Sequence, residues 1–331
     1  MGQLRPHRRE DYLTKLCPVT FDRGADCPLW LGFLRDITAD DQTLQGFLRR
    51  AVGMTLIGAV WDHVLFFLYG TGANGKSTFL IIVQVMLGPD YAMKAPPDLL
   101  MAKGQESHPT ERADLAGKRF VACIETAEGR RLAESLVKEL TGGDRVRARR
   151  MREDFREFSP SHKIWLAANH KPIIRGTDWG IWRRVKLVPF TVKIPDDKQD
   201  SRLGDKLKAE LPGILNWAVL GCLEWQTEGL GEPEAVRKAT AEYRSESDIP
   251  GAFVDDCCVV GPEYEAPASG LYKDYRRWAE ETGERILPQN VFGAALTERG
   301  FASDRFTSGI DKGKKRWTGI GRKSPLPTGE E

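Results

Sequence analysis

A glycine-rich segment that ends in lysine and serine offers phosphate-binding chemistry. Residues 70–77 fit the pattern GxxxxGK[ST], in which glycines let backbone N–H groups turn toward phosphate oxygens. The lysine places a cation on the β- and γ-phosphates, and the final hydroxyl reaches Mg²⁺. We therefore expect ATP and Mg²⁺ as cofactors. The nucleotide would bind at Gly70, Thr71, Gly72, Ala73, Asn74, Gly75, Lys76, Ser77 and Thr78.

Two apolar runs further along the chain end in side chains that could act on a bound nucleotide. Glu125 follows the first run, Glu128 comes three residues later, and Asn169 follows the second run. A carboxylate at a strand end can hold Mg²⁺ through water and polarise the attacking water, and a neutral amide can orient that water. We expect Glu125 to be catalytic and, with Ser77, a metal ligand, while Glu128 shares the catalytic work and Asn169 positions water. The alternative is two surface carboxylates and an asparagine that caps a turn.

Paired arginines precede the last apolar run. Arg183 and Arg184 carry permanent charges that could stabilise a transferring phosphoryl group, either in the same subunit or in a neighbouring one. The alternative is a salt-bridged pair at the start of a strand. The residues alone do not choose between the two arginines.

A second group of arginines could contact DNA. Arg147, Arg149, Arg150 and Arg152 lie in a stretch whose alternation suits a β-hairpin. Such a loop could bind the backbone phosphates of single-stranded DNA. A solvated charged face is the competing interpretation of any charge run.

The elements that must position these residues are indicated by four short apolar runs. They are separated by helical segments, which predicts an α/β fold with a parallel sheet covered on both faces. The runs occupy residues 64–69, 118–125, 162–169 and 184–190. Helices are expected at 76–87 and 132–141, where glycines follow the last apolar residue.

The two flanks differ from this core. Residues 1–52 are predicted to be mainly helical, and a helix is expected at 203–228. Four helical segments and two short strands then suggest a winged-helix domain over 231–321, followed by a disordered tail at 322–331. Its helices would occupy 233–245, 252–257, 269–281 and 288–299, its strands 301–306 and 315–320, and its wing the basic residues Lys312, Lys314, Lys315 and Arg316 beside Trp317.

The length, net charge and cysteine content of the chain limit its possible functions and cellular compartment. The 331 residues suffice for about two domains, and a net charge of +2 means that any nucleic-acid site depends on local clustering. The six cysteines form no CxxC pair, which indicates reduced thiols. No apolar segment follows the basic residues at the start, and none reaches the roughly 20 residues of a membrane span. We expect a soluble, cytoplasmic protein without membrane association.

Five sequence blocks in one order resemble a known family. They are Gly-Ala-Asn-Gly-Lys-Ser-Thr at 72–78, Glu-Thr-Ala-Glu-Gly-Arg-Arg at 125–131, Leu-Thr-Gly-Gly-Asp at 140–144, Asn-His-Lys-Pro at 169–172 and Gly-Ile-Trp-Arg-Arg at 180–184. Together they resemble the helicase half of phage and plasmid primase–helicases of superfamily 3, with the poxvirus primase–helicase as a distant relative.

The resemblance implies an AAA+ core at 53–230, a collar-like helical segment at 1–52 and a winged helix at 231–321. It implies a hexameric ring with ATP sites between subunits and 3′-to-5′ movement on single-stranded DNA. Glu125 would be the second motif, Asn169 the sensor, Arg183 or Arg184 the arginine finger, and 138–152 the block whose hairpin lines the channel. Forked DNA and a separate primase or polymerase would be partners, in a bacterium that carries the phage, prophage or plasmid.

Two departures from the family pattern change what we expect. A primase domain is missing from these residues, so priming is not expected of this chain, which would be a fragment or a helicase-only version. Met151 stands where the hairpin tip usually has an aromatic residue. We therefore expect phosphate contacts from Arg150 and Arg152 rather than stacking on bases.

Three functions remain to be compared. The leading one is an ATP-dependent ring helicase that acts in the replication of a mobile element. The second is a DNA-binding replication initiator, or an ATP-driven switch, without unwinding activity. The third, a small-molecule kinase, would have no use for an arginine-rich hairpin or a winged helix.

Overall fold

The computed structural model describes residues 4–96, 98–102, 109–124, 128–174 and 179–323. The chain divides into two compact units, and the first comprises Met1–Ile174 with Trp179–Ala241. The second is formed mainly by residues 242–331. Among the described residues, no helix combines the length and apolar character needed to cross a membrane.

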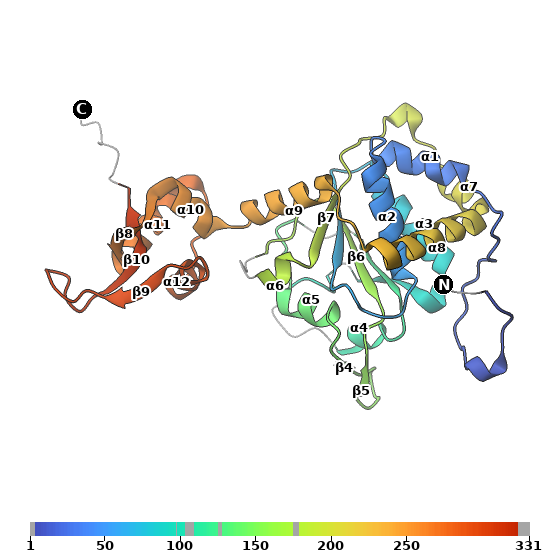
Figure 1. Ribbon diagram of the computed structural model, residues 1–331, viewed down its shortest axis with the longest axis horizontal. Helices are drawn as coiled ribbons and strands as arrows, with labels where there is room; N and C mark the ends of the chain where they lie inside the picture. The colour runs from blue at the N-terminus through green and yellow to red at the C-terminus, as the bar shows by residue number, and fades with distance from the viewer. Residues whose placement is uncertain (1–3, 97, 103–108, 125–127, 175–178, 324–331) are drawn as a thin grey trace. The chain divides into compact units, whose positions relative to one another are not determined.

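A parallel five-stranded sheet forms the centre of the first unit (Figure 1). Its strands, in spatial order, are β2 (Ala92–Ala95), β3 (Phe120–Ile124), β6 (Lys163–Ala168), β1 (Leu65–Tyr69) and β7 (Val185–Pro189). The four strands predicted from apolar runs are present, and the α/β prediction with a parallel sheet is confirmed. The fifth, β2, was missed because it is a short edge strand with no continuous apolar run.

The register brings the carboxyl ends of the central strands together. β1 lies between β6 and β7, and its last residue, Tyr69, pairs with Ala168 on one side and Pro189 on the other. On the far side of β6, Ile124 of β3 pairs with Ala167. Side chains that follow Tyr69 and Ala168 therefore emerge at one edge of the sheet, as parallel strands require.

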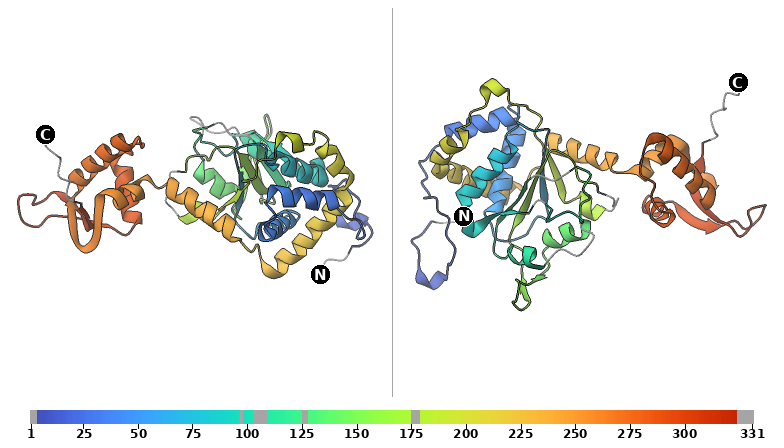
Figure 2. Two further views of the ribbon diagram at one scale, coloured as in Figure 1. Left: turned by 90° about the horizontal axis from the view of Figure 1, so that it is seen from above. Right: turned by 180° about the vertical axis from the view of Figure 1, so that it is seen from behind.

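Helices cover both faces of this sheet. On one face lie α1 (Pro28–Ile37), α2 (Gln42–Thr55), α3 (Lys76–Tyr91), α7 (Leu203–Ala209) and α8 (Leu211–Glu228). The short helices α5 (Glu134–Leu140) and α6 (Trp179–Trp182) lie on the other side, and α4 (Pro109–Ala113) lies close to the hairpin described below (Figures 1 and 2). Gly88 interrupts α3 with a non-helical backbone ahead of Pro89, in agreement with the predicted end of this helix.

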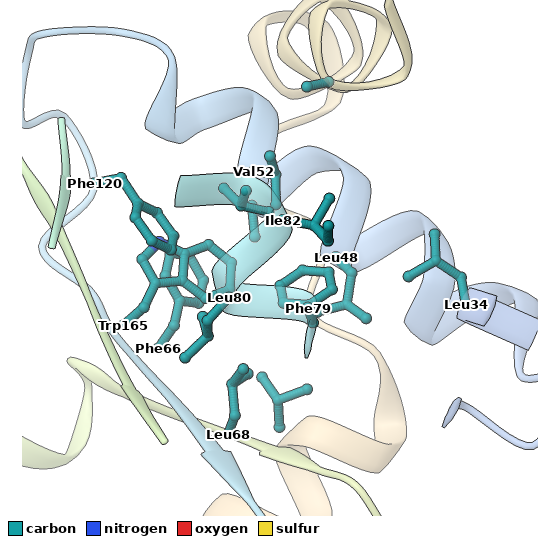
Figure 3. Packing of buried hydrophobic residues seen from close by; sticks show 14 of the residues in the cluster. Leu34, Leu48, Val52, Phe66, Leu68, Phe79, Leu80, Ile82, Phe120 and Trp165 are labelled. Atoms are coloured by element: carbon teal, nitrogen blue, oxygen red, sulfur yellow. The ribbon is translucent and has the colours of Figure 1, made fainter. Parts of the chain in front are cut away.

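Aromatic side chains fill the layer between the sheet and α1–α3 (Figure 3). The ring of Trp165 on β6 stacks on Phe66 of β1 with centroids 4.3 Å apart, and lies 5.8 Å from Phe120 of β3. Phe79 of α3 stacks in turn on Trp30 of α1, with centroids 5.5 Å apart. Because these rings are almost wholly buried, they fix α1 and α3 against the sheet.

The start of the chain differs from the prediction. The expected helical segments near residues 29–37 and 44–52 are present as α1 and α2, but residues 4–27 contain only a 3₁₀ turn, η1 (Arg9–Asp11). This segment is held by polar contacts, such as Leu16 N–H to the Asp90 carboxylate at 2.8 Å, and by Cys17, Val19 and Phe21, which pack against the hydrophobic core. The mainly helical interpretation of residues 1–52 was therefore wrong for its first half.

The helix predicted at 203–228 is two helices. α7 ends before Glu210 and α8 begins with Leu211 and Pro212. The Glu210 carboxylate accepts hydrogen bonds from the N–H groups of Leu29 and Trp30, at 3.0 and 2.9 Å, at the start of α1. The break therefore places a carboxylate where it satisfies two otherwise unpaired helix donors.

A two-stranded hairpin belongs to the first unit as well. It consists of β4 (Val146–Ala148) and β5 (Arg156–Phe158), which pair in antiparallel register from Val146–Phe158 to Ala148–Arg156. Its turn carries residues 149–155. A hairpin was expected in this stretch, and α4 lies against its first strand.

The second unit is built around a three-stranded antiparallel sheet in the order β8-β10-β9. Its core includes Phe253, Tyr275, Phe292 and Trp317. α9 (Glu234–Glu246) begins in the first unit and ends in the second. The chain then continues through α10 (Ile249–Cys257), β8 (Cys258–Pro267), α11 (Ala268–Thr282), α12 (Gln289–Glu298), β9 (Ala302–Arg305) and β10 (Lys315–Arg322). Strand β8 was missed because most of its side chains are polar or exposed.

Candidate functional site

The loop between β1 and α3 has a shape that demands its glycines. Gly72 and Gly75 have φ angles of +108° and +82°, values that glycine adopts without strain. A Cβ atom on Gly70 would lie 2.2 Å from the Phe190 carbonyl oxygen, and one on Gly75 would lie 2.5 Å from a methyl group of Ile37. The sequence pattern is therefore explained by backbone geometry and by close packing on both sides of the loop.

Lys76 is the first residue of α3 and follows Gly75 of this loop directly. Its ammonium group donates hydrogen bonds to the Gly70 carbonyl at 2.6 Å, the Asn74 side-chain oxygen at 3.0 Å and the Asn169 side-chain oxygen at 3.1 Å. All three acceptors are neutral, and within the described residues no carboxylate pairs with this charge. Burial lowers the pKa of Lys76 to about 8. Such a lysine fits a phosphate group, since phosphate oxygens would supply the missing negative charge.

Asn74 and Asn169 are the two amides that surround this lysine. Asn74 also donates a hydrogen bond of 3.1 Å to the Phe190 carbonyl, which ties the loop to the residue after β7. Asn169 follows the last residue of β6 and reaches Lys76 because β6 is the neighbour of β1. The structure thus brings together Lys76 and the predicted sensor.

Only one of the two predicted carboxylates, Glu128, lies within the described residues. Glu125, the residue after Ile124 of β3, lies outside the described residues. Glu128 is described: its carboxylate is 80% exposed and lies 3.8 Å from Nδ1 of His170, the residue after Asn169. Glu128 therefore lies beside His170, one of the residues that follow β6.

Within the described residues, few side chains near the loop could bind Mg²⁺ directly. Ser77 lies in the first turn of α3 with an exposed side chain, on the loop that would hold the phosphates. No group of three histidine, cysteine, aspartate or glutamate side chains gathers within the part of the chain that the structure describes. A Mg²⁺ ion that keeps several waters and takes its remaining ligands from Ser77 and phosphate oxygens is compatible with this arrangement.

The two arginines differ in their surroundings. Arg184 is 8% exposed, and its guanidinium donates to the Thr141 hydroxyl at 3.1 Å and to the Gly180 carbonyl at 2.6 Å. The Arg183 side chain is exposed, and within the described ranges it has no hydrogen bond or ion pair. Arg184 is therefore held inside the protein, whereas the Arg183 side chain is accessible to another molecule.

Both arginines precede the strand whose far end meets the phosphate loop. Val185, the first residue of β7, pairs with Leu65 at the start of β1, and Pro189 pairs with Tyr69 at its end. A strand rises about 3.3 Å per residue, so the four steps from Val185 to Pro189 span roughly 13 Å. Arg183 lies at the opposite end of the sheet from Lys76, too far for its side chain to reach the loop of the same subunit.

The four arginines of the hairpin are all exposed. The guanidinium groups of Arg147 and Arg149 lie 4.7 and 4.6 Å from the ring centroid of Phe155, which is 45% exposed. Arg150 forms an ion pair of 3.1 Å with Asp114 on the protein surface. Arg152 has a φ angle of +64° in the turn. The hairpin thus combines positive charge with an aromatic ring.

An aromatic residue, Phe155, lies in the turn of the same hairpin as Met151. Met151 is 74% exposed, as expected for a tip residue, but the aromatic group of the hairpin is supplied four residues later in the chain. The sequence showed the alternation that carries Phe155 yet gave no sign that two arginines would flank its ring. Pairing of β4 with β5 is what brings them together.

Two protein-family models match parts of this chain. Residues 68–184 match a family described as "Family of unknown function (DUF5906)", and residues 1–39 match the family "D5 N terminal like". The first match contains the glycine-rich loop, Asn169 and both arginines.

Curated viral proteins are similar to most of the chain. "Putative helicase L207/L206" of Acanthamoeba polyphaga mimivirus is 27% identical over 270 residues, which cover 75% of this chain and 28% of that protein. "Putative helicase 022R" of Frog virus 3 is 28% identical over 75% of this chain and 27% of its own length. "Putative primase C962R" of African swine fever virus is 30% identical over 54% of this chain and 19% of its own length. The chain spans less than a third of these relatives.

Among solved structures, the C-terminal region of NrS-1 has a similar fold. The TM-score is 0.53 at 10% sequence identity, over 92% of this chain and 78% of that one. At this identity the likeness concerns the fold alone.

Proposed function

We propose that this chain is the motor part of an ATP-dependent DNA helicase of superfamily 3, with an AAA+ core that works as a hexameric ring on single-stranded DNA. The observation that carries the proposal is the Lys76 ammonium group. It is buried, bonded only to neutral oxygens within the described residues, and in contact with Asn169 at the carboxyl edge of a parallel sheet. The similarity to viral proteins named as helicases and primases supports the choice of DNA as the substrate.

The residues of the loop would bind the phosphates of ATP together with Mg²⁺. ATP would supply the phosphoanhydride bond that is hydrolysed, and Mg²⁺ would supply positive charge beside the phosphates. The loop N–H groups and Lys76 hold the β- and γ-phosphates, and Ser77 offers its hydroxyl to the metal. Asn169 orients the attacking water, and Glu125, at the end of the run that forms β3, accepts its proton. Glu128 assists from the edge of the site.

Arg183 would complete the site of a neighbouring subunit. Its exposure, and its place at the opposite end of the sheet from its own Lys76, support action between subunits rather than within one. A ring satisfies this need at every interface, since the same two surfaces meet around a closed cycle. The hexamer and the 3′-to-5′ direction are taken from the resemblance to superfamily 3.

The hairpin would contact DNA and so couple ATP hydrolysis to movement along the strand. Arg147, Arg149, Arg150 and Arg152 would contact backbone phosphates, and Phe155 would stack on a base. Forked DNA is the proposed substrate, with a separate primase or polymerase as partner in the replication of a virus, phage or plasmid.

A second candidate function is a replication initiator or switch that hydrolyses ATP without unwinding. The second unit supports this alternative, because a winged helix would have the same order of helices and strands as α10 to β10 and the same sheet order β8-β10-β9. The loop between β9 and β10 exposes Lys312 and Lys314, and Lys315 lies over the Trp317 ring at 5.6 Å. Such a wing could bind duplex DNA without any motor.

The hairpin provides a test of the proposed substrate. Replacing both Arg150 and Arg152 by alanine should weaken single-stranded DNA binding and reduce the slope of log Kd against log salt by about 1.4, because two phosphate contacts are lost at about 0.7 each. Phe155→Ala should weaken binding without changing the slope, since stacking releases no counterions. Both variants should lose the stimulation of ATP hydrolysis by single-stranded DNA.

A charge-matched control lies on α7. Lys206→Ala with Lys208→Ala removes two exposed cations that are paired with Asp200 and Asp205, and should leave DNA affinity and its salt slope unchanged. Equal effects from the α7 pair and the hairpin pair would mean that general charge, not the hairpin, binds DNA.

The lowered pKa of Lys76 predicts how nucleotide affinity depends on pH. Phosphate oxygens favour the charged ammonium and so raise its pKa above the value of about 8 in the free protein. The affinity for Mg·ATP should be constant below pH 8 and should fall by up to about tenfold per pH unit above it, as one proton must be taken up on binding. Titration calorimetry in two buffers at pH 8.5 would measure that proton directly.

Lys163 supplies the control for this pH profile. Its pKa is also lowered to about 8, chiefly by burial, but it bonds to the carbonyls of Ile57 and Ala59 away from the loop. Lys163→Met should keep the fall in affinity above pH 8. A flat profile in the wild type, or loss of the fall in Lys163→Met, would rule out Lys76 as its cause.

A further inference from the structure

The loop between β9 and β10, residues 306–314, exposes an apolar side chain at its tip. Ile310 is 99% exposed, the largest exposed fraction among the large apolar side chains of the described residues. The loop projects beyond the helices of the second unit (Figures 1 and 2). Single exposed aliphatic side chains are common on protein surfaces, so the role of this one depends on the loop that presents it and on the charges around it.

Hydrogen bonds hold the β9–β10 loop in a defined shape. Gly313 N–H donates to the Phe306 carbonyl at 2.8 Å, and the Arg305 guanidinium donates to the Gly313 carbonyl at 3.0 Å. Lys312 N–H donates to the Gly309 carbonyl at 3.2 Å, which closes a turn with the apolar residue at its second position. The exposed side chain is therefore presented by a hydrogen-bonded turn at the end of a strand pair.

Positive charge surrounds this tip. Lys312 and Arg305 are exposed, and neither pairs with a carboxylate in the part of the chain that the structure describes. Lys314 pairs with Asp311 at 2.8 Å, yet its side chain is 64% exposed. Cations of this kind bind the phosphates of a DNA backbone and release the counterions condensed there. The loop thus combines an aliphatic tip with cations beside it.

The aromatic rings next to the loop are not open to bases. Trp317 is 4% exposed, and the Lys315 ammonium lies 5.6 Å from its ring centroid. Phe306 is partly buried, and the Arg316 guanidinium lies 5.3 Å from its ring centroid. Sites for single strands use exposed aromatic rings that stack on bases, whereas minor-groove proteins insert aliphatic side chains between the base steps of a duplex. An aliphatic tip is therefore suited to duplex DNA.

Helix α12 lacks the charge to lead a contact with DNA. It contains no lysine or arginine, and its one charged residue is Glu298. Arg299, which follows the helix, is held by the Asp248 carboxylate and donates to the Ala295 carbonyl at 2.8 Å. A helix that enters a groove depends on contacts with the flanking phosphates for its register and affinity. The charge distribution therefore favours the β9–β10 loop over α12.

We propose that the β9–β10 loop binds duplex DNA as a wedge. Ile310 inserts between two base pairs from the minor groove, and Lys312, Lys314 and Arg305 contact the phosphates on either side. This inference takes DNA as the ligand from the proposed function, but it requires neither ATP nor the hairpin of the first unit. Insertion partly unstacks one base step and kinks the duplex, so bending accompanies binding.

The experiment uses the full chain without nucleotide and a duplex of about 20 base pairs with a central TA step, which kinks easily. Fluorescent labels at both ends report binding by anisotropy and bending by energy transfer. The wild type should bind and bend this duplex. Ile310→Ser should lower the affinity about tenfold and remove the bending, with the same salt dependence, because no phosphate contact is lost.

Replacing the lysines should have a different effect. Lys312→Ala with Lys314→Ala should reduce the slope of log Kd against log salt by about 1.8, because two phosphate contacts are lost at about 0.9 each. These side chains and Ile310 are exposed, so none of the changes should alter the thermal midpoint.

Two controls lie in the same unit. Val260→Ser removes another β-branched apolar side chain, 60% exposed, which pairs with Ile320 away from the loop, and should change neither affinity nor bending. Gln289→Ala with Asn290→Ala, at the exposed start of α12, should leave the bending intact. Binding of single-stranded DNA, which is assigned to the hairpin of the first unit, should be unchanged in all of these variants.

Three results would overturn the inference. They are a wild type that does not bind and bend the duplex, an Ile310→Ser protein that binds and bends it like the wild type, and loss of bending in the α12 variant. Each of these leaves the proposed motor intact. Failure of the wild type to bind single-stranded DNA or to hydrolyse ATP is the separate result that would count against the proposed function.

Discussion

Replacing Lys76 by alanine is expected to lower the rate of ATP hydrolysis about 10³-fold, in line with the loss of a group that stabilises charge in the transition state. The ammonium group is the only cation that hydrogen-bonds within the loop among the described residues, and it lies 3.1 Å from the side-chain oxygen of Asn169. Its loss removes the positive charge that would stabilise the negative charge on the γ-phosphate during hydrolysis. Steady-state release of phosphate, with and without single-stranded DNA, is the measurement.

The fold should survive this change. The buried ammonium is bonded to neutral oxygens and its pKa is lowered by burial, so alanine removes an unfavourable buried charge while leaving three acceptors without this donor. These effects oppose each other, and the thermal midpoint should move by only a few degrees. Lys171→Ala, which removes a cation 5.1 Å from the Tyr69 ring, is a nearby control that should keep most of the activity. Normal turnover by folded Lys76→Ala would remove the assignment of the phosphate loop.

Arg183→Ala should reduce ATP hydrolysis about 10³-fold without weakening ATP binding, the effect expected of an arginine finger supplied by another subunit. The exposed side chain has no hydrogen bond or ion pair within the described part of the chain, so its removal should leave the thermal midpoint unchanged. Arg184→Ala should behave differently. It removes a buried guanidinium that bonds to Thr141 and Gly180, and should lower the thermal midpoint.

Mixing two inactive variants tests whether the arginine acts between subunits. A Lys76→Ala subunit retains its Arg183, and an Arg183→Ala subunit retains its loop, so some interfaces of a mixed assembly contain both groups. ATP hydrolysis should therefore return in part when the two variants are combined. Absence of any recovery, in assemblies shown to contain both variants, would mean that Arg183 does not complete a neighbour's site.

The core of the fold was predictable because its determinants are local. Continuous apolar runs mark buried parallel strands, and the glycines of the loop follow from positive φ angles and from close contacts that only a hydrogen can occupy. The expected neighbours Lys76 and Asn169 met because each follows one of two strands that pair directly. Continuous apolar runs are enough to locate such strand ends, and parallel pairing then places the residues that follow them at one edge of the sheet.

What the sequence could not show depends on tertiary contacts. β2 and β8 lack an apolar run because one is a short edge strand and the other is largely exposed, so periodicity gave no signal. Arg183 and Arg184 are equivalent in sequence, and only burial distinguishes them. A cavity beside the loop is lined by α1, by the loop and by residues 192–203, which lie more than 100 residues further along the chain, and no local pattern reveals such a combination.

Strand displacement on a forked duplex tests the central claim most directly, because it separates a motor from an ATP-dependent switch. The complete chain with Mg·ATP is expected to release the labelled strand, and neither Lys76→Ala nor the wild type with a non-hydrolysable analogue should do so. ATP hydrolysis that single-stranded DNA stimulates while the fork stays intact would contradict the helicase and favour the initiator or switch.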